Sequence, residues 1–558
     1  MEVRLLLAFL LMGAVMFVTP YFFKTGTPPP KPVPAAAAPG GQPDAAASSA
    51  PAPPVAAAEA GAPPAPSASA TAQQTLPPFI VDTDLYRIVF SNQGATVRSW
   101  QLKKYHGNDG KLLELMNSSA DLGYPFSLYV PGQDALTKKI NWAWYEQTAD
   151  PDGLGVTFLY SDARTTVRKV FRFQKNSYLS QVSAELSVDG KPVPSMISWR
   201  GGFGDLTVAN PSGTEHTLFF DASANKLDQQ TARNAKSGPV TSSGTYSFAG
   251  LDDSYFAMVF LPEGNSTMQV VTFADTTRTP FEEKPAAFTG AAISGGDLNN
   301  FALFVGPKDI DLLKRINPKL EQVVDFGWLS ILAKPLFLLV NWFNSSFVHN
   351  FGWSIVIVTI VLNFMLFPVK LSNMKSMRKM QALKPQIDAI NAKYKNLKMT
   401  DPRKADQNQE VMDLYKKFGV NPMGGCVPML LQIPFFIAFY KVFTVSVEMR
   451  GAPWLWVTDL SQPEHLPIRI LPIIMIATQF WVQKMTPQGN VDPNQQKMMM
   501  FMPLIFGFMF YNFASGLVLY YLTSNLVGMG QQWFFNHTEA AQEAARSVEP
   551  PKKKNGRK

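Results

Sequence analysis

Polar side chains interrupt several long apolar stretches between residues 350 and 535. The stretch before Pro368 contains Ser354, Thr359 and Asn363, the next contains Gln432 and Lys441, another contains Gln479, and the last contains Ser524, Asn525, Gln531 and Gln532. Placing such groups in lipid is costly, so they normally face a protein interior or water. Their chemistry is hydrogen bonding and hydration, which predicts a wet face shared by several apolar helices.

Lys441 is the one strongly basic residue placed deep within these stretches. It follows Gln432 by nine positions, which turns a helix about 180° past two full turns, so the two side chains need not share a face. Two interpretations stay open. The ammonium group of Lys441 lines the polar face, or it reaches toward the lipid headgroups, because Glu448 follows only seven residues later.

The sequence lacks the patterns that carry most catalytic chemistry. It has no Walker loop, no HExxH pattern and no convincing Ser/His/Asp set. Its 5 His residues are scattered, and its single Cys, Cys426, cannot form a disulfide within the chain. The Gly-rich run 200–204 is interpreted as a structural loop. We therefore predict that the chain is not an enzyme and uses neither a metal nor a cofactor.

Six apolar stretches are candidates for membrane spans, because about 20 apolar residues cross a hydrocarbon core of about 30 Å. The first, Leu5 to Phe23, runs longer than the core of a cleaved signal peptide and predicts an uncleaved anchor. The other five are about Phe351 to Pro368, Cys426 to Val447, Leu466 to Val482, Met498 to Phe513 and Ser515 to Phe534. Six spans place both termini on the same side of the membrane.

The basic residues fix the orientation of these spans. Residues 370–425 hold twelve basic and five acidic side chains, and the chain ends in a basic tail. The positive-inside rule makes both segments cytoplasmic. The formal charge of +8 is therefore explained better by topology than by binding of nucleic acid. The weakly charged loop from Trp454 to His465 then lies outside, and so does the segment between the first two spans.

The predicted parts of the chain differ sharply in composition. They are a transmembrane anchor (1–23), a disordered Pro/Ala-rich tether (24–75), a β-sandwich domain (76–324), an interfacial amphipathic helix (325–349), the second span (350–369), a basic helical hairpin (370–425), four further spans with short loops (426–535) and a basic cytoplasmic tail (536–558). The β domain is predicted from short alternating segments such as 166–173 and 178–188, punctuated by Asn, Asp and Gly.

The basic hairpin has helical periodicity on both arms. Its first arm carries Lys375, Met377, Arg378 and Met380. The Met-rich face has two equally good interpretations. It is a plastic surface for unfolded apolar ligands, because Met is flexible and polarizable, or it merely packs the two arms together.

Proline breaks recur in the later spans, at Pro428, Pro434, Pro467, Pro472 and Pro503. Proline frees backbone carbonyls and kinks helices, so these spans need not close into a tight bundle. The pattern favours an open polar groove beside an apolar wall. A groove of this kind lets a hydrophilic segment cross the bilayer while a new apolar helix moves into lipid, without ATP.

The membrane half closely resembles the YidC/Oxa family of membrane protein insertases, in the long form of Gram-negative bacteria. The matching stretches are Asp325-Phe326-Gly327-Trp328-Leu329, Asn421 to Pro434, Val447-Glu448-Met449-Arg450, Asp492-Pro493, Gln495-Gln496-Lys497 and Ser515 to Tyr521. The resemblance implies a membrane α-helical bundle of six spans with a five-helix insertase core, plus a periplasmic all-β supersandwich like that of sugar-binding mutarotases.

The resemblance also implies a function and its partners. It implies insertion and folding of nascent membrane proteins in the inner membrane, alone or with the Sec translocon, through a hydrophilic groove. The hairpin and basic tail are candidate contacts for ribosomes. Groove positions are Thr359, Asn363, Gln432, Lys441, Ser524 and Asn525, and contact-wall positions are Ile433, Pro434, Phe436, Phe501, Leu504, Tyr520 and Tyr521. An aromatic pair such as Tyr520 and Tyr521 is more often packing.

One residue departs from the pattern of the family. The family commonly places Arg, or sometimes Lys, five residues before the terminal Pro of the second span, and counting back from Pro368 gives Asn363. Asn363 can hydrogen-bond but cannot attract acidic residues of a substrate. We hypothesise that Lys441 partly substitutes for the missing charge.

Two other classes of protein compete with this interpretation. Broken helices and intramembrane polar groups also suit a secondary transporter, but no inverted repeat is evident. The mutarotase-like fold suggests an enzyme that modifies envelope sugars, although a fold does not establish chemistry.

Overall fold

The computed structural model describes residues 75–538 apart from 118–121, 209, 264–265, 280–283, 296–298, 395–402, 421–426 and 487–492, together with 542–543 and 546. The predicted anchor (1–23), all but the last residue of the tether (24–75) and most of the tail (536–558) lie outside the described residues. So does the motif segment 421–426, with its single Cys.

The first part of the described chain is an all-β domain with two sheets. The smaller sheet has the order β1 (Phe79–Asp82), β2 (Tyr86–Ser91), β3 (Thr96–His106) and β4 (Leu112–Glu114). The larger sheet runs in the order β5 (Ser127–Tyr129), β11 (Met196–Trp199), β17 (Ala286–Ser294), β16 (Ser266–Thr277), β14 (Val240–Asp252), β15 (Phe256–Leu261), β18 (Asn299–Pro307), β9 (Leu179–Val188), β8 (Thr165–Arg172), β7 (Gly155–Ser161) and β6 (Glu146–Ala149). Three more strands lie beside this path. Strand β10 (Lys191–Pro192) pairs with β9. Strand β12 (His216–Asp221) pairs with both β13 (Lys226–Gln230) and β14. The prediction of a β-sandwich domain is confirmed.

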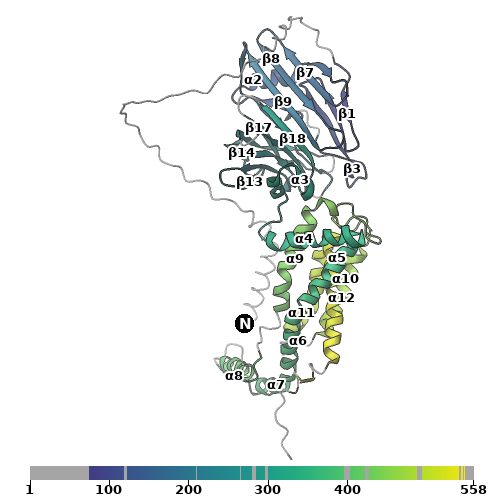
Figure 1. Cartoon of the computed structure of the whole chain (residues 1–558). Coiled ribbons are helices and arrows are strands. Elements are labelled where there is room, and N and C mark those ends of the chain that lie inside the picture. Colours follow the sequence, from purple (N-terminus) through teal and green to yellow (C-terminus); the bar gives the residue numbers. More distant parts are fainter. Residues whose placement is uncertain are drawn as a thin grey trace, which may run out of the picture. The chain divides into compact units, whose positions relative to one another are not determined.

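Alternation of side chains explains why these strands form layers. Buried and more exposed residues alternate along β8, and the same alternation continues in β9 beside it (Figure 1). The buried faces of both sheets supply one aromatic core, in which the rings of Phe90 and Phe171 lie 4.9 Å apart between centroids. The domain also contains two helices that the sequence did not predict, α2 (Asp134–Trp142) and α3 (Ile310–Ile316), and a short 3-10 helix, η3 (Pro318–Val323).

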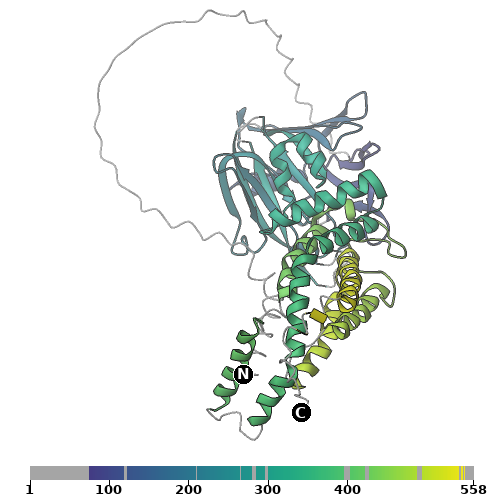
Figure 2. The ribbon, with the colours of Figure 1, turned by 60° about the horizontal axis from the view of Figure 1, so that its bottom comes forward.

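The second part is helical. It contains α4 (Ser330–Phe343), α5 (Phe351–Met365), α6 (Phe367–Ala382), α7 (Lys384–Lys393), α8 (Arg403–Lys417), α9 (Val427–Val445), α10 (Ile470–Met485), α11 (Pro493–Phe510) and α12 (Ser515–His537). The longest of these, α12, packs against α10 and α5 (Figure 2). A bend of 57° separates α5 from α6 at the residue before Phe367.

The helices do not confirm the six predicted spans. Among the described residues, one helix is long and apolar enough to cross a membrane, Ser330–Val348, and the bent pair α5 and α6 passes the same test together. The apolar parts of α9, α10 and α11 are shorter. Helices α9 and α11 each continue through an internal proline, Pro434 and Pro503. The helix singled out by this test is the one that we expected to lie along the membrane surface.

Candidate functional site

A set of hydrogen-bonded polar side chains joins four helices in the second part of the chain. We call Thr359, Asn363, Lys370, Gln432, Ser524 and Gln531 the polar cluster. Thr359 and Asn363 lie on α5, Lys370 on α6, Gln432 on α9, and Ser524 and Gln531 on α12. Helix α12 packs against α5, and Thr359, Asn363, Ser524 and Gln531 are all buried.

Asn363 is the centre of the polar cluster and is only 4% exposed. Its Nδ2 donates to the carbonyl of Thr359 at 2.8 Å. Its Oδ1 accepts from Lys370 Nζ at 2.5 Å and from Ser524 Oγ at 3.3 Å. Gln531 Nε2 donates to the backbone carbonyl of Asn363 at 3.1 Å. One buried amide thus connects α5 to both α6 and α12.

Gln432 extends the polar cluster to α9. Its Nε2 donates to the hydroxyl of Tyr520 at 2.7 Å and to Ser524 Oγ at 3.4 Å. Ser524 therefore accepts from Gln432 and donates to Asn363, so that one hydrogen-bonded path runs from α9 through α12 to α5 and α6. The predicted positions Thr359, Asn363, Gln432 and Ser524 are brought together.

Two other predicted groove positions lie apart from this path. Asn525 donates from Nδ2 to Thr478 Oγ1 at 3.3 Å, and so links α12 to α10 instead. Lys441 lies beside the turn that precedes α4, where a Cβ added to Gly327 would come within 3.2 Å of Lys441 Cε. The structure brings Lys370, and not Lys441, to Asn363, and the hypothesis that Lys441 partly substitutes for the missing charge stays a prediction.

Sequence reasoning missed Lys370 although a signal was present. Lys370 follows Asn363 by seven positions, which is about two helical turns and puts both on one face. We counted Lys370 with the cytoplasmic charges because Pro368 was taken as the end of the span. In the structure helix α6 begins at Phe367, with Pro368 in its first turn, where proline is tolerated.

An apolar wall is formed by the described side chains of α11. Phe501, Leu504, Ile505 and Phe508 are between 50% and 82% exposed. On the opposite face of the helix Phe510 is buried and its ring lies 5.4 Å from that of Phe436 on α9. Phe436 is itself buried, whereas Ile433 and Pro434 are half-buried on the same helix. These positions remain predicted contact sites.

The aromatic pair on α12 is engaged in packing. The ring of Tyr520 stacks on Phe439 at 4.2 Å between centroids, and Tyr520 is 3% exposed. The ring of Tyr521 lies 5.0 Å from that of Phe510. The hydroxyl of Tyr520 also accepts the hydrogen bond from Gln432. Tyr520 therefore holds Gln432 in the polar cluster and is not an exposed contact residue.

The basic hairpin has its own small core. Met380, Leu383, Ile387, Tyr415 and Val420 are buried together, and Met377 packs against them. This geometry supports the interpretation that the methionines pack the arms. Lys375 is exposed, and Arg378 donates to Gln381 Oε1 at 2.8 Å.

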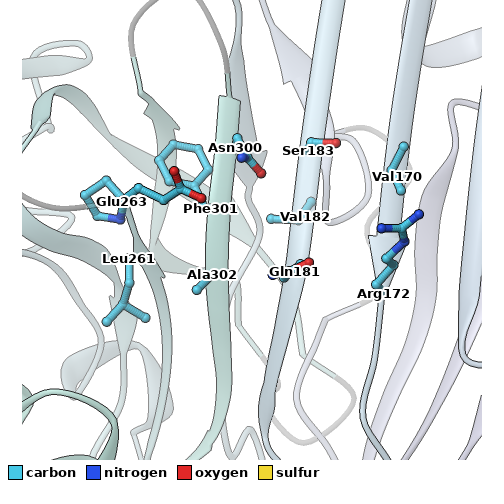
Figure 3. Close-up of a pocket in the computed structure, with 11 residues that line it drawn as sticks. Val170, Arg172, Gln181, Val182, Ser183, Leu261, Glu263, Asn300, Phe301 and Ala302 are labelled. Carbon is cyan, nitrogen blue, oxygen red and sulfur yellow. The ribbon is translucent and has the colours of Figure 1, made fainter. Parts of the chain in front are cut away.

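A hollow of about 380 Å³ lies on the larger sheet of the β domain, over β8, β9 and β18. Figure 3 shows Arg172 and Glu263 on opposite sides of it, with Gln181, Ser183 and Asn300 between them. Sugar isomerisation needs both an acid and a base within reach of the substrate. Glu263 is the one carboxylate among the described residues that line the hollow, so this lining does not favour the sugar-modifying enzyme.

Comparison with known proteins accounts for both parts of the chain. Residues 79–339 match the family described as YidC periplasmic domain, and residues 342–543 match the family described as 60Kd inner membrane protein. The "Membrane protein insertase YidC" of Geotalea daltonii is 35% identical over 482 residues, which are 82% of this chain and 86% of that protein. The chain belongs to the YidC family of membrane protein insertases.

Two further YidC proteins are similar. The insertase of Geobacter sulfurreducens is 34% identical over 83% of this chain and 87% of its own length. A crystal structure described as an active YidC insertase with its first transmembrane domain resolved is 20% identical, covers 83% of this chain and 94% of its own, and superposes with a TM-score of 0.37. Membership of the YidC family places the β domain in the periplasm and the helical part in the inner membrane.

Proposed function

We propose that the polar cluster holds the hydrophilic part of a nascent membrane protein while the apolar part moves into lipid past α11. The chain is a membrane protein insertase of the inner membrane, as its family is. The observation that carries the proposal is the hydrogen-bonded path from Gln432 through Ser524 to Asn363 and Lys370, which is enclosed by apolar helices.

The physical need for such a path is simple. A hydrophilic segment that leaves water for hydrocarbon loses its hydrogen bonds, which costs several kcal/mol for each unsatisfied group. Side chains that donate and accept within the membrane reduce this cost. Gln531 Oε1 can accept such a hydrogen bond from the substrate, because it is buried and has no donor among the described residues. Burial of about 20 apolar residues of the substrate then drives insertion without ATP.

The arrangement in the membrane is part of the proposal. Six spans cross the inner membrane, both termini are cytoplasmic, and α4 lies in the periplasmic interface. The placement of α4 is supported by an ion pair between Lys334 on α4 and Glu321 on η3, and by Ile331 and Trp342, which are 86% and 50% exposed. Lys334 is satisfied by a carboxylate and needs no lipid partner.

The partners follow from the same topology. Substrates are nascent membrane proteins, inserted by this chain alone or together with the Sec translocon. The exposed Lys375 and the basic tail are candidate contacts for ribosomal RNA, which offers dense negative charge. Insertion is a binding and transfer process, so we propose no catalysis of bond cleavage.

The function is tested with liposomes that contain only the purified full chain. A single-span protein with a short neutral exported tail is added without ATP, and its insertion is read by protease protection. We expect protection well above that in empty liposomes. Protection that requires added Sec translocon would restrict the function to assisted insertion, and no protection with either would contradict it.

A matched pair of substitutions tests the polar cluster. Gln432→Leu removes the hydrogen bonds that link α9 to α12. Loss of hydrogen bonds between neutral groups costs roughly 1 kcal/mol each, so we expect insertion to fall by about tenfold. Lys441→Gln changes a polar side chain of the same helix beside Gly327 and should leave insertion unchanged. Equal effects of the two substitutions would contradict a role for the path.

A further inference from the structure

The loop between α9 and α10 contains a tight turn with an apolar tip. Trp454 and Val457 exchange two backbone hydrogen bonds of 2.8 Å, so Leu455 and Trp456 form the tip between them. We call residues 454–457 the tryptophan turn. Leu455 has a φ of 50° at the first central position of this turn, where glycine is favoured because L side chains rarely adopt this conformation.

The backbone of the turn does not explain the leucine at its tip. The side chain of Leu455 is 64% exposed, so it contributes little to the packing of the loop. Glycine or asparagine adopts a positive φ with less strain. No charged residue occurs from Gly451 to Thr458, and Trp456 is also exposed. The strained tip therefore presents an uncharged apolar surface, which points to a contact outside the chain.

The tryptophan turn is held rigidly against α5. Its Trp454 is buried, and the ring lies 5.6 Å from that of Trp353 on α5. A Cβ added to Gly352 would clash with the Trp454 ring, so the glycine allows this close approach. Asn350, the N-cap of α5, donates from Nδ2 to the carbonyl of Pro453 at 3.0 Å. The first turn of α5 therefore sets the position of the tip.

The same turn is tied to the start of α10 through a buried carboxylate. Trp456 Nε1 donates to Glu464 Oε1 at 2.7 Å, and the backbone N–H of Leu471 donates to Glu464 Oε2 at 2.9 Å. The N–H of Trp456 is thus satisfied inside the chain, and its ring can leave water without losing a hydrogen bond.

An apolar surface continues from the end of this loop onto the helical part. Ile468, just before α10, is 67% exposed, and Ile470 and Ile473 on α10 are exposed as well. Helix α10 belongs to the part that lies in the inner membrane, whereas the start of the loop contacts the periplasmic β domain through Val447. Along the chain, the tryptophan turn therefore lies between a periplasmic contact and a membrane helix. The headgroups of the periplasmic leaflet are found at this level.

We propose that the tryptophan turn is a membrane anchor, whose Leu455 and Trp456 side chains insert into the interface of the periplasmic leaflet. Tryptophan is enriched in this layer, and an exposed leucine is stabilised there by leaving water. The interface with a water-soluble partner has a polar rim, which the uncharged tip lacks. Because Trp454 and Glu464 tie the turn to α5 and α10, the anchor fixes the depth of both helices in the bilayer.

The depth of α5 matters for the polar cluster. Asn363 follows Phe351, the first residue of α5, by twelve positions, or about 18 Å along the helix axis. An anchor at the periplasmic interface therefore holds Asn363 near the middle of a hydrocarbon core of about 30 Å. This consequence rests on the proposed function, whereas the anchor itself does not.

The first test measures the depth of the tip and does not depend on insertion. Leu455→Cys is made in a chain that carries Cys426→Ser, and an environment-sensitive fluorophore is attached. In liposomes containing the full chain, we expect blue-shifted emission that is quenched more by lipids with a nitroxide near the headgroup than by lipids with one near the end of the acyl chain. Trp142→Cys, on the exposed surface of α2, is the water control, and Ile473→Cys on α10 is the lipid control.

Two results of this measurement would overturn the anchor. Emission and quenching at position 455 that match those at position 142 would place the tip in water. A label at 455 that is shielded from water but quenched by neither lipid would show that a protein surface covers the tip.

A second test separates anchoring from folding of the loop. Asparagine tolerates a positive φ, so Leu455→Asn relaxes the backbone and removes the apolar side chain, whereas Leu455→Met keeps an apolar side chain. With the label moved to the exposed neighbour by Thr458→Cys, Leu455→Asn should remove most of the quenching by the shallow nitroxide, while thermal unfolding in detergent begins no earlier. Leu455→Met should retain the quenching. Equal quenching in the two variants would mean that Leu455 only shapes the loop, and the proposal would be wrong.

Discussion

A buried ammonium group in the β domain is held by backbone carbonyls and lies 5.8 Å from the ring centroid of Tyr145. Lys169 lies on β8, is 1% exposed, and donates to the carbonyls of Gly94 at 2.7 Å, Ala95 at 3.3 Å and Phe126 at 2.7 Å. No carboxylate accompanies it among these contacts. The residue joins β8 to the turn at Gly94 and Ala95 and to Phe126, which are distant from it in the sequence, and this is a structural role that a surface lysine cannot perform.

We expect Lys169→Met to destabilise the chain. The methionine fills the space but leaves three buried carbonyls without a donor, which costs about 3 kcal/mol. Thermal unfolding of the full chain in detergent should therefore begin at lower temperature in the β domain. Lys175→Met is the control, because Lys175 is exposed. Equal unfolding temperatures for the two variants would show that the carbonyls find other donors.

At the scale of elements, the basic hairpin forms by packing of its arms. Ile387 on α7 is 1% exposed and lies in one cluster with Tyr415 on α8. The cluster is small, so each of its members contributes a large share of the free energy that holds α7 to α8. We therefore expect the hairpin to open independently of the rest of the helical part.

Ile387→Ala tests that independence. Loss of the buried side chain should weaken the packing of α7 on α8 by about 3 kcal/mol. Trypsin should then cut the lysines and arginines of α7 and α8 faster, while the cutting of α12 stays unchanged. Ala389→Gly, which alters the same helix outside the cluster, should have a smaller effect. If α12 is cut faster as well, the hairpin is not an independent unit.

The helices were easier to predict than their functional contacts. The last predicted span, Ser515 to Phe534, agrees closely with α12 (Ser515–His537), because a long apolar run bounded by polar residues determines it. The strand order was not predictable, since β5 pairs with β11 about 70 residues later, and such pairing depends on the whole core. Lys370 was missed because Pro368 was interpreted as the end of the span, whereas in the structure it lies in the first turn of α6.

At the scale of the whole molecule, the loop after α9 contacts the β domain. It contains the short helix η6 (Val447–Met449) and Arg450, both in a stretch that carries the resemblance to the family. Val447 belongs to the core cluster of the β domain, and Arg450 Nη2 donates to the carbonyl of His106 at 2.6 Å. The guanidinium also pairs with Asp205 and lies 5.5 Å from the ring centroids of Tyr255 and Phe256.

This contact should depend on pH through Glu448. Burial, with smaller contributions from Asp309 and Asp311, raises the pKa of Glu448 to about 7. The protonated side chain of Glu448 therefore stabilises the contact. This stabilisation is fully present below the ordinary pKa of a glutamate, about 4.3, and is lost as the pH rises through about 7. Hydrogen exchange of residues 447–450, corrected for the intrinsic effect of pH, should show more frequent opening at pH 8 than at pH 5. Glu448→Gln should remove the difference, and a difference that persists in this variant would assign it to another group.

Arg450 should be the strongest single anchor of the β domain to the helical part. Its side chain is 5% exposed and that of Asp205 is 0% exposed, so Arg450→Met leaves a buried carboxylate without its cation. Removing one partner of a buried pair costs about 4 kcal/mol, most of which is the desolvation of the remaining charge. We expect faster hydrogen exchange in both 447–450 and the turn around Asp205, with α12 unchanged. Adding Asp205→Asn removes the stranded charge, so the double variant should be more stable than Arg450→Met alone. If the second substitution gives no recovery, the anchor is the packing of Arg450 on the two aromatic rings rather than the ion pair.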